Sequence, residues 1–506
     1  MSTKKSKTKS ALLNMLFNFI YQVTNTIVNI IIPPLIIGRF GSAVNGLIST
    51  IKQILGYVQL VGAGISESTV VSLYKPIADD DKKHISSIFN ACSVSFTKMG
   101  IVFNVLSVLV AFVYPIFVKE DINYMFLVCL ILVLSIAGAS EFYVIGKCRT
   151  LLIADQKIYI VNIAQIAGAI ANLLVTVVLI SLDQNILIIQ AGASIVYAMR
   201  ILIVYLYVKK HYSFLNKKEM PDFNAISKRK AATVHQLSGL ISFGSQTIFV
   251  SVFCGLAEAS VYSVYNLVFT GINTILSTVS SALLATIGTI AASEGKEKLK
   301  KVFSLYESMY YLLVFVMYTI TYIMFLSFVK IYTAGATDAN YVREEFALLF
   351  CIMGITNCLR TPGGTLINAV GHYEETKNRA LIEMAICFCL ECILVFKFKA
   401  VGVLIATIVA YLYRTVDVFV YSNRRILEQS IKNTIIKVGV NVLLYILFAY
   451  VGCLIAVDAG NFATWIVKAI VVSIVVVTIF GAANFFVSQK EYKYMFQRFL
   501  RRGLKS

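Results

Sequence analysis

The chain has 506 residues, of which 58% are hydrophobic and only 14% are charged, and its mean hydropathy is +0.79. Soluble domains carry about 25% charged residues, so this composition excludes a soluble protein and predicts an all-α polytopic membrane protein. The net charge of +19 is compatible with nucleic-acid binding or with basic cytoplasmic loops. The distribution of the charges along the chain separates these two interpretations.

Apolar runs of about the 20 residues that a bilayer requires recur along the chain. They predict about fourteen transmembrane helices, at residues 11–37, 43–74, 85–114, 122–145, 158–182, 186–208, 237–257, 259–291, 302–330, 344–370, 378–397, 400–421, 433–456 and 464–487. Two interruptions are expected within them, at Pro33-Pro34 and at the TPGG segment of residues 361–364, because proline removes a backbone donor and kinks a helix.

An even number of spans places both termini on the same side of the membrane. The loops on that side contain 33 Lys and Arg residues, whereas the opposite loops contain six. The positive-inside rule therefore predicts cytoplasmic N- and C-termini in a multi-pass protein of the cell membrane. The lysine-rich N-terminus followed by a long span predicts an uncleaved first helix rather than a signal peptide. Topology thus accounts for the basic charge, and we expect no nucleic-acid partner.

The two halves of the chain resemble each other. TLLIADQK at residues 150–157 is similar to TLINAVGH at residues 365–372, an offset of 215 positions, and both segments lie at the cytoplasmic end of a predicted helix. Six helices in each half give both halves the same orientation, as in the parallel repeats of transporters. The expected organisation is an N-terminal lobe at 1–208, a basic cytoplasmic linker loop at 209–236, a C-terminal lobe at 237–421, and a terminal helix pair with a basic tail at 422–506.

Amide side chains follow one face of the first predicted span. Asn14, Asn18, Gln22, Asn25 and Asn29 are spaced by three or four residues, which places them on one side of an α-helix. Single amides in a span are often interhelical hydrogen-bond partners. Five on one face favour a water-lined cavity, to which we also assign Gln246 of the seventh span.

Charged side chains also fall inside predicted spans. The cations are Lys52, Lys98, Arg200, Arg360, Arg414 and Lys468. A charge at the centre of the bilayer costs about 2.5–3.5 kcal/mol, so it requires a partner, a cavity, or a route to the headgroups. Lys468 is placed to reach the headgroups, and Arg414 to pair with Asp417 at i+3. For Arg200 and Arg414 a route to the headgroups is an alternative. Lys52, Lys98, Arg200 and Arg360 are our candidate cavity cations for an anionic substrate.

The sequence contains no phosphate-binding loop G-x-x-x-x-G-K-[ST] and no local hydrolase motif. Its four His residues fall in predicted turns, and most of its ten Cys residues lie within apolar runs without zinc or disulfide spacing. We therefore expect no catalytic residue, no metal and no cofactor, and we predict that the protein is not an enzyme.

The segments IGRFGSAVNGL after the first span, LYKPIADDDKKHISSIF after the second, and TLINAVGHYEETKNRALI around the turn after the tenth resemble the polysaccharide flippases of the multidrug/oligosaccharidyl-lipid/polysaccharide (MOP) exporter superfamily. The resemblance spans nearly the whole chain. It implies two pseudo-symmetric six-helix lobes in a V shape plus a terminal helix pair, and alternating access around a hydrophilic, cationic cavity. It also implies that an undecaprenyl-pyrophosphate-linked oligosaccharide moves from the cytoplasmic to the outer leaflet for polysaccharide biosynthesis.

Three alternatives remain at this point. A cation-coupled multidrug exporter or a peptidoglycan lipid-precursor flippase of the same superfamily would have the same layout. A membrane glycan polymerase or glycosyltransferase is an alternative of another class, although the predicted outer loops are short for such an enzyme. As partners we expect the lipid-linked oligosaccharide, membrane lipids and other polysaccharide-assembly membrane proteins, and we take a monomer as the default.

Overall fold

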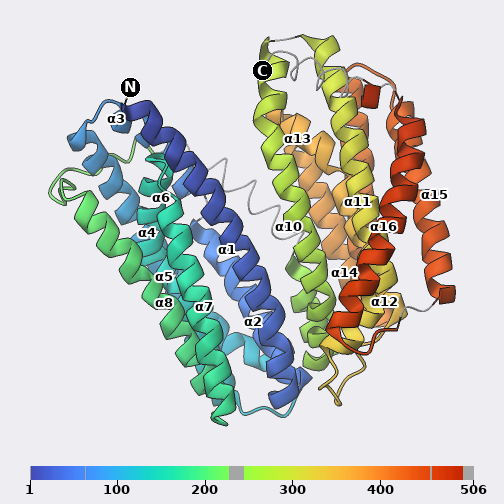
Figure 1. Cartoon of the computed structure of the whole chain (residues 1–506). Helices are drawn as coiled ribbons and strands as arrows, with labels where there is room; N and C mark the ends of the chain where they lie inside the picture. Colours follow the sequence, from blue (N-terminus) through green and yellow to red (C-terminus); the bar gives the residue numbers. More distant parts are fainter. Residues whose placement is uncertain are drawn as a thin grey trace. The chain divides into compact units, whose positions relative to one another are not determined.

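The computed structural model describes residues 2–62, 64–226, 244–293, 295–455, 458–489 and 491–493, and all regular elements in these ranges are helices (Figure 1). The chain divides into two compact units, Met1–Ser260 and Val261–Ser506. Residues 227–243, 456–457, 490 and 494–506, which include parts of the predicted linker loop, seventh span and basic tail, lie outside the described ranges. The predicted lobe limits therefore stay predictions.

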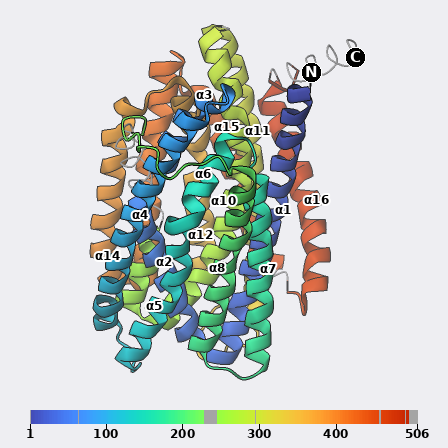
Figure 2. The same cartoon turned by 90° about the vertical axis from the view of Figure 1, so that its left-hand side faces the viewer.

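The first unit contains α1 (Ser2–Phe40), α2 (Ser42–Gln59), α3 (Ile65–Ala78), α4 (Lys82–Val113), α5 (Tyr124–Ser140), α6 (Gly146–Ala154), α7 (Tyr159–Ser181), α8 (Ile186–His211) and the helix Gly244–Cys254. In both views α7 and α8 run side by side, with α1 next to α7 (Figure 2). The second unit contains α10 (Leu256–Ser293), α11 (Lys296–Tyr332), α12 (Glu344–Leu359), α13 (Thr361–Val370), α14 (Tyr373–Val420), α15 (Lys432–Ile455) and α16 (Phe462–Val487). Only the first turn of α10 belongs to the first unit.

Eleven helices among the described residues are long and apolar enough to cross a membrane. Two further predicted spans are present in another form, and two others share one of the eleven helices. The second span corresponds to α2, which continues into the 3₁₀ turn Leu60–Gly62, and to α3; the seventh is represented by Gly244–Cys254. The eleventh and twelfth lie within α14, where the non-helical Lys399 (φ 51°) separates them. The prediction of an all-α polytopic membrane protein with about fourteen spans is confirmed.

The expected interruptions differ between the two proline sites. The helix is interrupted at TPGG: α12 ends at Leu359, and α13 begins at Thr361 with Pro362 in its first turn, where a missing N–H costs no helical hydrogen bond. In contrast, α1 remains helical through Pro33 and Pro34. A π-helical turn, η3 (Glu141–Ile145), separates α5 from α6, and sequence patterns did not predict it.

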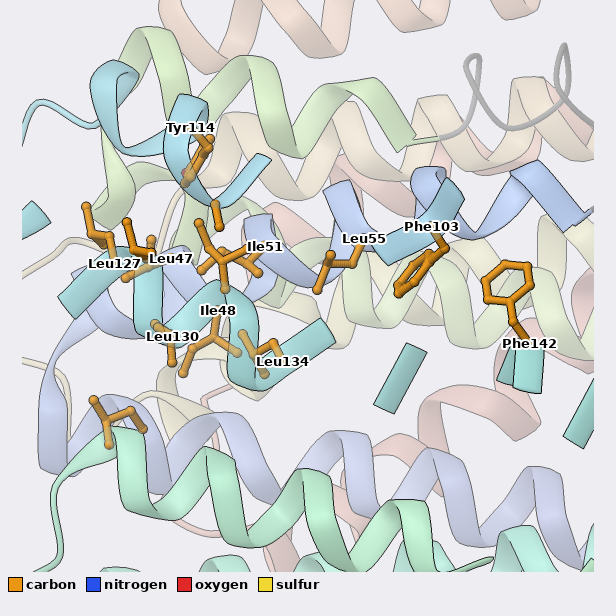
Figure 3. Close-up of a cluster of buried hydrophobic side chains, with 14 of the residues drawn as sticks. Leu47, Ile48, Ile51, Leu55, Phe103, Tyr114, Leu127, Leu130, Leu134 and Phe142 are labelled. Carbon is orange, nitrogen blue, oxygen red and sulfur yellow. The ribbon is translucent and has the colours of Figure 1, made fainter. Parts of the chain in front are cut away.

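A cluster of buried apolar side chains holds the first unit together (Figure 3). Leu47, Ile48 and Ile51 of α2 pack with Leu130 of α5 and Phe103 of α4, all with at most 3% of their surface exposed. Lipid is as apolar as these residues, so close packing rather than water exclusion stabilises the cluster. Many large apolar side chains of the long helices are exposed instead, as on α16, which fits a lipid-facing surface.

Buried polar contacts attach the terminal helices α15 and α16 to α11. Lys437 of α15 lies 3.6 Å from Glu307 of α11 and 3.5 Å from Glu491, which follows α16. Asn441 of α15 and Asn484 of α16 exchange two amide hydrogen bonds of 3.0 and 2.8 Å. Within the second unit, specific polar contacts therefore join the helix pair to α11.

The described part of the linker loop folds back onto α4. Asn90 donates hydrogen bonds of 2.9 Å to the carbonyls of Asn216 and Glu219, and the hydroxyl of Ser87 donates to the carbonyl of Met220 at 2.5 Å. Residues 212–226 are thus anchored to the protein at one end of the first unit.

Candidate functional site

A cavity of about 950 Å³ lies within the first unit. Residues of the helices α1 to α8 and of the turn η3 form its walls. The walls carry three cations and two carboxylates besides amides, hydroxyls and apolar side chains. Polar walls of this kind inside apolar helices can bind a hydrophilic molecule within the thickness of a membrane.

Only part of the predicted amide stripe of α1 reaches this cavity. Asn25 and Asn29 line it, whereas Gln22 and the exposed Asn18 lie on α1 outside its lining. Asn14 joins α1 to the turn before α7: its Nδ2 donates to the Gln156 carbonyl at 2.8 Å, and its Oδ1 accepts from the Tyr159 N–H at 3.0 Å. One face of a single helix therefore serves both a cavity and a helix junction.

Amides from other helices complete the polar wall. Gln59 of α2, Gln165 and Asn172 of α7, and Gln190 of α8 also line the cavity. A pattern search within one helix does not find such a set, because its members come together only when the helices pack. Amide groups donate and accept hydrogen bonds, as sugar hydroxyls require.

Two of the four predicted cavity cations are in this cavity. Lys52 lines it from α2, is exposed, and has no ion pair among the residues that the structure describes. Arg200 of α8 is only 6% exposed, and its guanidinium lies 3.8 Å from the centre of the Tyr197 ring, within the range of a cation–π contact. The cavity thus has one exposed and one buried cationic group among the predicted residues.

A carboxylate and a further arginine accompany Arg200. Glu141 of η3 approaches Arg149 of α6 at 2.8 Å and Arg200 at 3.7 Å. All three line the cavity. Arg149 was not among the predicted site residues, because the sequence placed it in a cytoplasmic loop. The sequence pattern that could have linked Arg149 to Glu141 is their spacing of eight residues, which corresponds to about two helical turns.

The other predicted site residues lie elsewhere. Lys98 of α4 is exposed and has its ammonium 5.9 Å from the centre of the Phe223 ring in the folded-back loop. Gln246 is buried in the helix Gly244–Cys254. Neither residue lines the cavity described above.

Arg360 belongs to the second unit, in a network of buried ion pairs. Its guanidinium contacts Glu383 of α14, and Nη2 donates to the Asn357 side chain at 2.8 Å. Arg414 lies 3.8 Å from the same Glu383 and 2.6 Å from Asp417. This arrangement compensates the charge of Arg360 inside the protein.

No group of three or more His, Cys, Asp or Glu side chains that could hold a metal ion occurs in the described part of the chain. The cysteines described are free thiols. The cavity walls offer amides, hydroxyls, cations and carboxylates, which are groups for hydrogen bonding and ion pairing.

No protein-family model matches the chain, and no curated protein matches its sequence significantly. Solved structures match its fold. A structure of the lipid II flippase MurJ in an inward closed conformation is 13% identical with a TM-score of 0.66, and the match covers 93% of this chain and 99% of that chain. An inward-facing multidrug-resistance MATE transporter of the MOP superfamily is 12% identical with a TM-score of 0.65, covering 82% of this chain and 96% of that chain. A MOP superfamily transporter from Pyrococcus furiosus, whose binding pocket is described as having reverse polarity, is 12% identical with a TM-score of 0.56. That match covers 83% of this chain and 95% of that chain.

Proposed function

Since this chain has the fold of the MOP-superfamily transporters, we propose that it is a flippase for a polyprenyl-pyrophosphate-linked oligosaccharide. It moves an undecaprenyl-linked repeat unit from the cytoplasmic to the outer leaflet of the cell membrane for surface polysaccharide synthesis. The observation that carries the proposal is the cavity of the first unit, in which hydrogen-bonding amides and cations lie together inside membrane-spanning helices.

The cations supply the recognition of the pyrophosphate. Lys52 has no ion pair within the described residues, and Arg200 lies in the same wall with Tyr197 against its guanidinium. A guanidinium binds phosphate oxygens in a bidentate manner, and an ammonium binds them as a point charge. A doubly charged pyrophosphate entering this cavity would pair with both groups.

The amides supply the recognition of the sugar. Asn25, Asn29, Gln59, Gln165 and Asn172 line the same cavity as the cations, so headgroup and sugar can be bound at one time. The polyprenyl tail remains in the bilayer, where its burial is favourable without any protein contact. Transport of this kind needs no covalent step, and we propose no enzymatic activity, cofactor or nucleic-acid partner.

Orientation and location follow from the loop charges. The bias of 33 basic residues against six supports our proposal that both termini lie in the cytoplasm of a cell-membrane protein. Substrate would then load from the side on which lipid-linked sugars are assembled and leave on the other side, by alternating access.

A second candidate is a flippase for a peptidoglycan lipid precursor. The match to MurJ covers a larger share of this chain than the match to the MATE transporter, 93% against 82%. A lipid precursor of this type also combines a polyprenyl pyrophosphate with sugars, so the same cavity chemistry would serve it. The drug-exporter alternative gains less support, because cations outnumber carboxylates in the cavity walls.

The test measures which leaflet holds the lipid-linked intermediates in cells that lack this gene. Accumulation of the oligosaccharide intermediate on the cytoplasmic face, with loss of surface polysaccharide and normal peptidoglycan, is the expected result. Accumulation of the peptidoglycan precursor instead would favour the second candidate. Normal export of both intermediates would rule out the flippase function and direct attention to drug efflux.

A further inference from the structure

Glu141 lies between two arginine side chains in the cavity wall, and we propose that it is a built-in counter-ion that competes with the anionic headgroup of the substrate for Arg149 and Arg200. The proposal rests on the proposed function, because it requires an anionic group to enter this cavity. It assigns to Glu141 a positioning role: the carboxylate holds the arginines while the site is empty and takes them back when the substrate leaves.

The contacts of Glu141 are close but incompletely formed. Its Oε1 lies 2.8 Å from Arg149 and its Oε2 lies 3.7 Å from Arg200. Among the described residues, Oε1 of Glu141 and Nε of Arg200 are nevertheless buried atoms without an aligned hydrogen bond. The carboxylate therefore compensates the charge of the two guanidiniums while leaving hydrogen-bond donors available.

Arg200 is buried, so its charge requires an anionic partner whether or not substrate is bound. With 6% of its surface exposed, its charge would be uncompensated in an empty cavity if Glu141 were neutral. A pyrophosphate carries more charge than a carboxylate and offers more acceptor oxygens, so it can replace Glu141 and fill the open donors of both guanidiniums. The two arginines then exchange an internal anion for an external one, so both guanidiniums keep an anionic partner with and without substrate.

The local backbone supports a side chain that changes partners. Glu141 is the first residue of the π-helical turn η3, whereas Arg149 is on α6 and Arg200 is on α8. Single π-helical turns within α-helices occur frequently at functional sites, because they release a side chain from the regular helical register. The three charged groups thus come from three different elements that meet at the cavity.

The proposal predicts opposite effects on binding and on transport. Replacement of Glu141 by the neutral isostere glutamine removes the competitor, so the dissociation constant for an anionic headgroup should fall about tenfold, a size typical of close charge pairs. Differences of this kind arise mainly in the dissociation rate, so transport at saturating substrate should become slower in the same variant. A purely structural role for Glu141 would instead weaken binding.

The experiment uses the purified full chain and farnesyl pyrophosphate as the probe, with binding measured by calorimetry and transport measured in vesicles loaded with a lipid-linked oligosaccharide. Glu141→Gln is compared with the wild type and with Glu67→Gln. Glu67 lines the same cavity from α3, so its neutralisation controls for net charge. Glu141→Asp keeps the charge but withdraws the carboxylate by one methylene, and an intermediate dissociation constant is expected; this variant keeps the test decisive if Glu141→Gln does not fold.

The outcomes separate this inference from the proposed function. Tighter binding and slower transport in Glu141→Gln, with a clearly smaller change in Glu67→Gln, support the role of Glu141. Unchanged or weaker binding in Glu141→Gln, or equal tightening in both glutamine variants, overturns it, while the flippase function stands if wild-type binding is lost in Arg200→Gln. Absence of wild-type binding and transport overturns both.

Discussion

Asn45 of α2 donates a hydrogen bond of 2.7 Å to the hydroxyl of Ser260 in the first turn of α10, and the two residues are 215 positions apart. This separation equals the offset of the sequence repeat between residues 150–157 and 365–372. The contact therefore joins positions that correspond to each other in the two halves of the chain. The neighbouring Gly46 shows how closely the two helices approach here.

We expect Gly46→Ala to destabilise the protein. A Cβ at this position would lie 1.8 Å from the backbone oxygen of Leu256, and a backbone atom cannot rotate away as a side chain can. Overpacking of this kind costs about 1–3 kcal/mol or more. The measurement is the melting temperature of the purified protein, with Gly38→Ala as the control, because a Cβ on Gly38 meets no atom within 4 Å. Equal melting temperatures for the two variants would contradict the close approach.

The amide stripe of α1 gives a second prediction, because the structure divides it. Asn25→Leu with Asn29→Leu removes two hydrogen-bonding groups from the cavity wall, and we expect export of the lipid-linked sugar to fall at least about tenfold. Asn18→Leu is the matched control from the same helix face, since Asn18 lies outside the cavity lining and is exposed. Surface polysaccharide per cell, normalised to the amount of protein in the membrane, is the readout. Equal losses from the control and the double variant would contradict a role for the cavity.

The number and class of the helices were predictable because span length and hydropathy are local properties of the sequence. Local spacing also predicted the pairing of Arg414 with Asp417, which is confirmed at 2.6 Å. The partner of Arg360 was not predictable in this way: Glu383 is 23 residues away on another helix, and only packing brings the two together. Charge inside a span therefore indicates that compensation exists, but not whether a cavity or a buried partner provides it.

One local signal within the sequence did point to the site and was missed. The sixth and twelfth predicted spans both contain Y-x-x-R, as YAMR at residues 197–200 and YLYR at 411–414. In the first unit this pattern places Arg200 over Tyr197 at the cavity, whereas in the second unit the ring of Tyr411 lies 4.8 Å from the guanidinium of Arg360. The same pattern thus serves a cavity in one half and an ion-pair network in the other.

The buried contacts of Lys437 predict how the terminal helices are held. Lys437→Met should leave the carboxylate of Glu307 buried without its cation, and we expect a loss of about 3–5 kcal/mol in the free energy of unfolding. The double variant Lys437→Met with Glu307→Gln removes the whole pair and should recover most of this loss. The wild type, the two single variants and the double variant are unfolded in the same detergent. The differences between their free energies of unfolding give the coupling energy of the pair. Additive effects of the two single substitutions would show that the pair contributes no specific interaction.

Arg360 provides the last prediction, because it was a candidate for substrate binding and the structure gives it buried partners. If its role is to compensate Glu383, Arg360→Met should lower the free energy of unfolding by about 3–5 kcal/mol, because both side chains are largely buried. Among molecules that still fold, the dissociation constant for a prenyl pyrophosphate should then stay within about twofold of the wild type. Arg200→Gln is the comparison, since its guanidinium lines the cavity of the first unit and its loss should weaken binding about tenfold or more. Weakened binding by Arg360→Met at unchanged stability would instead restore Arg360 to the substrate site, and the second unit would then contribute directly to recognition of the headgroup.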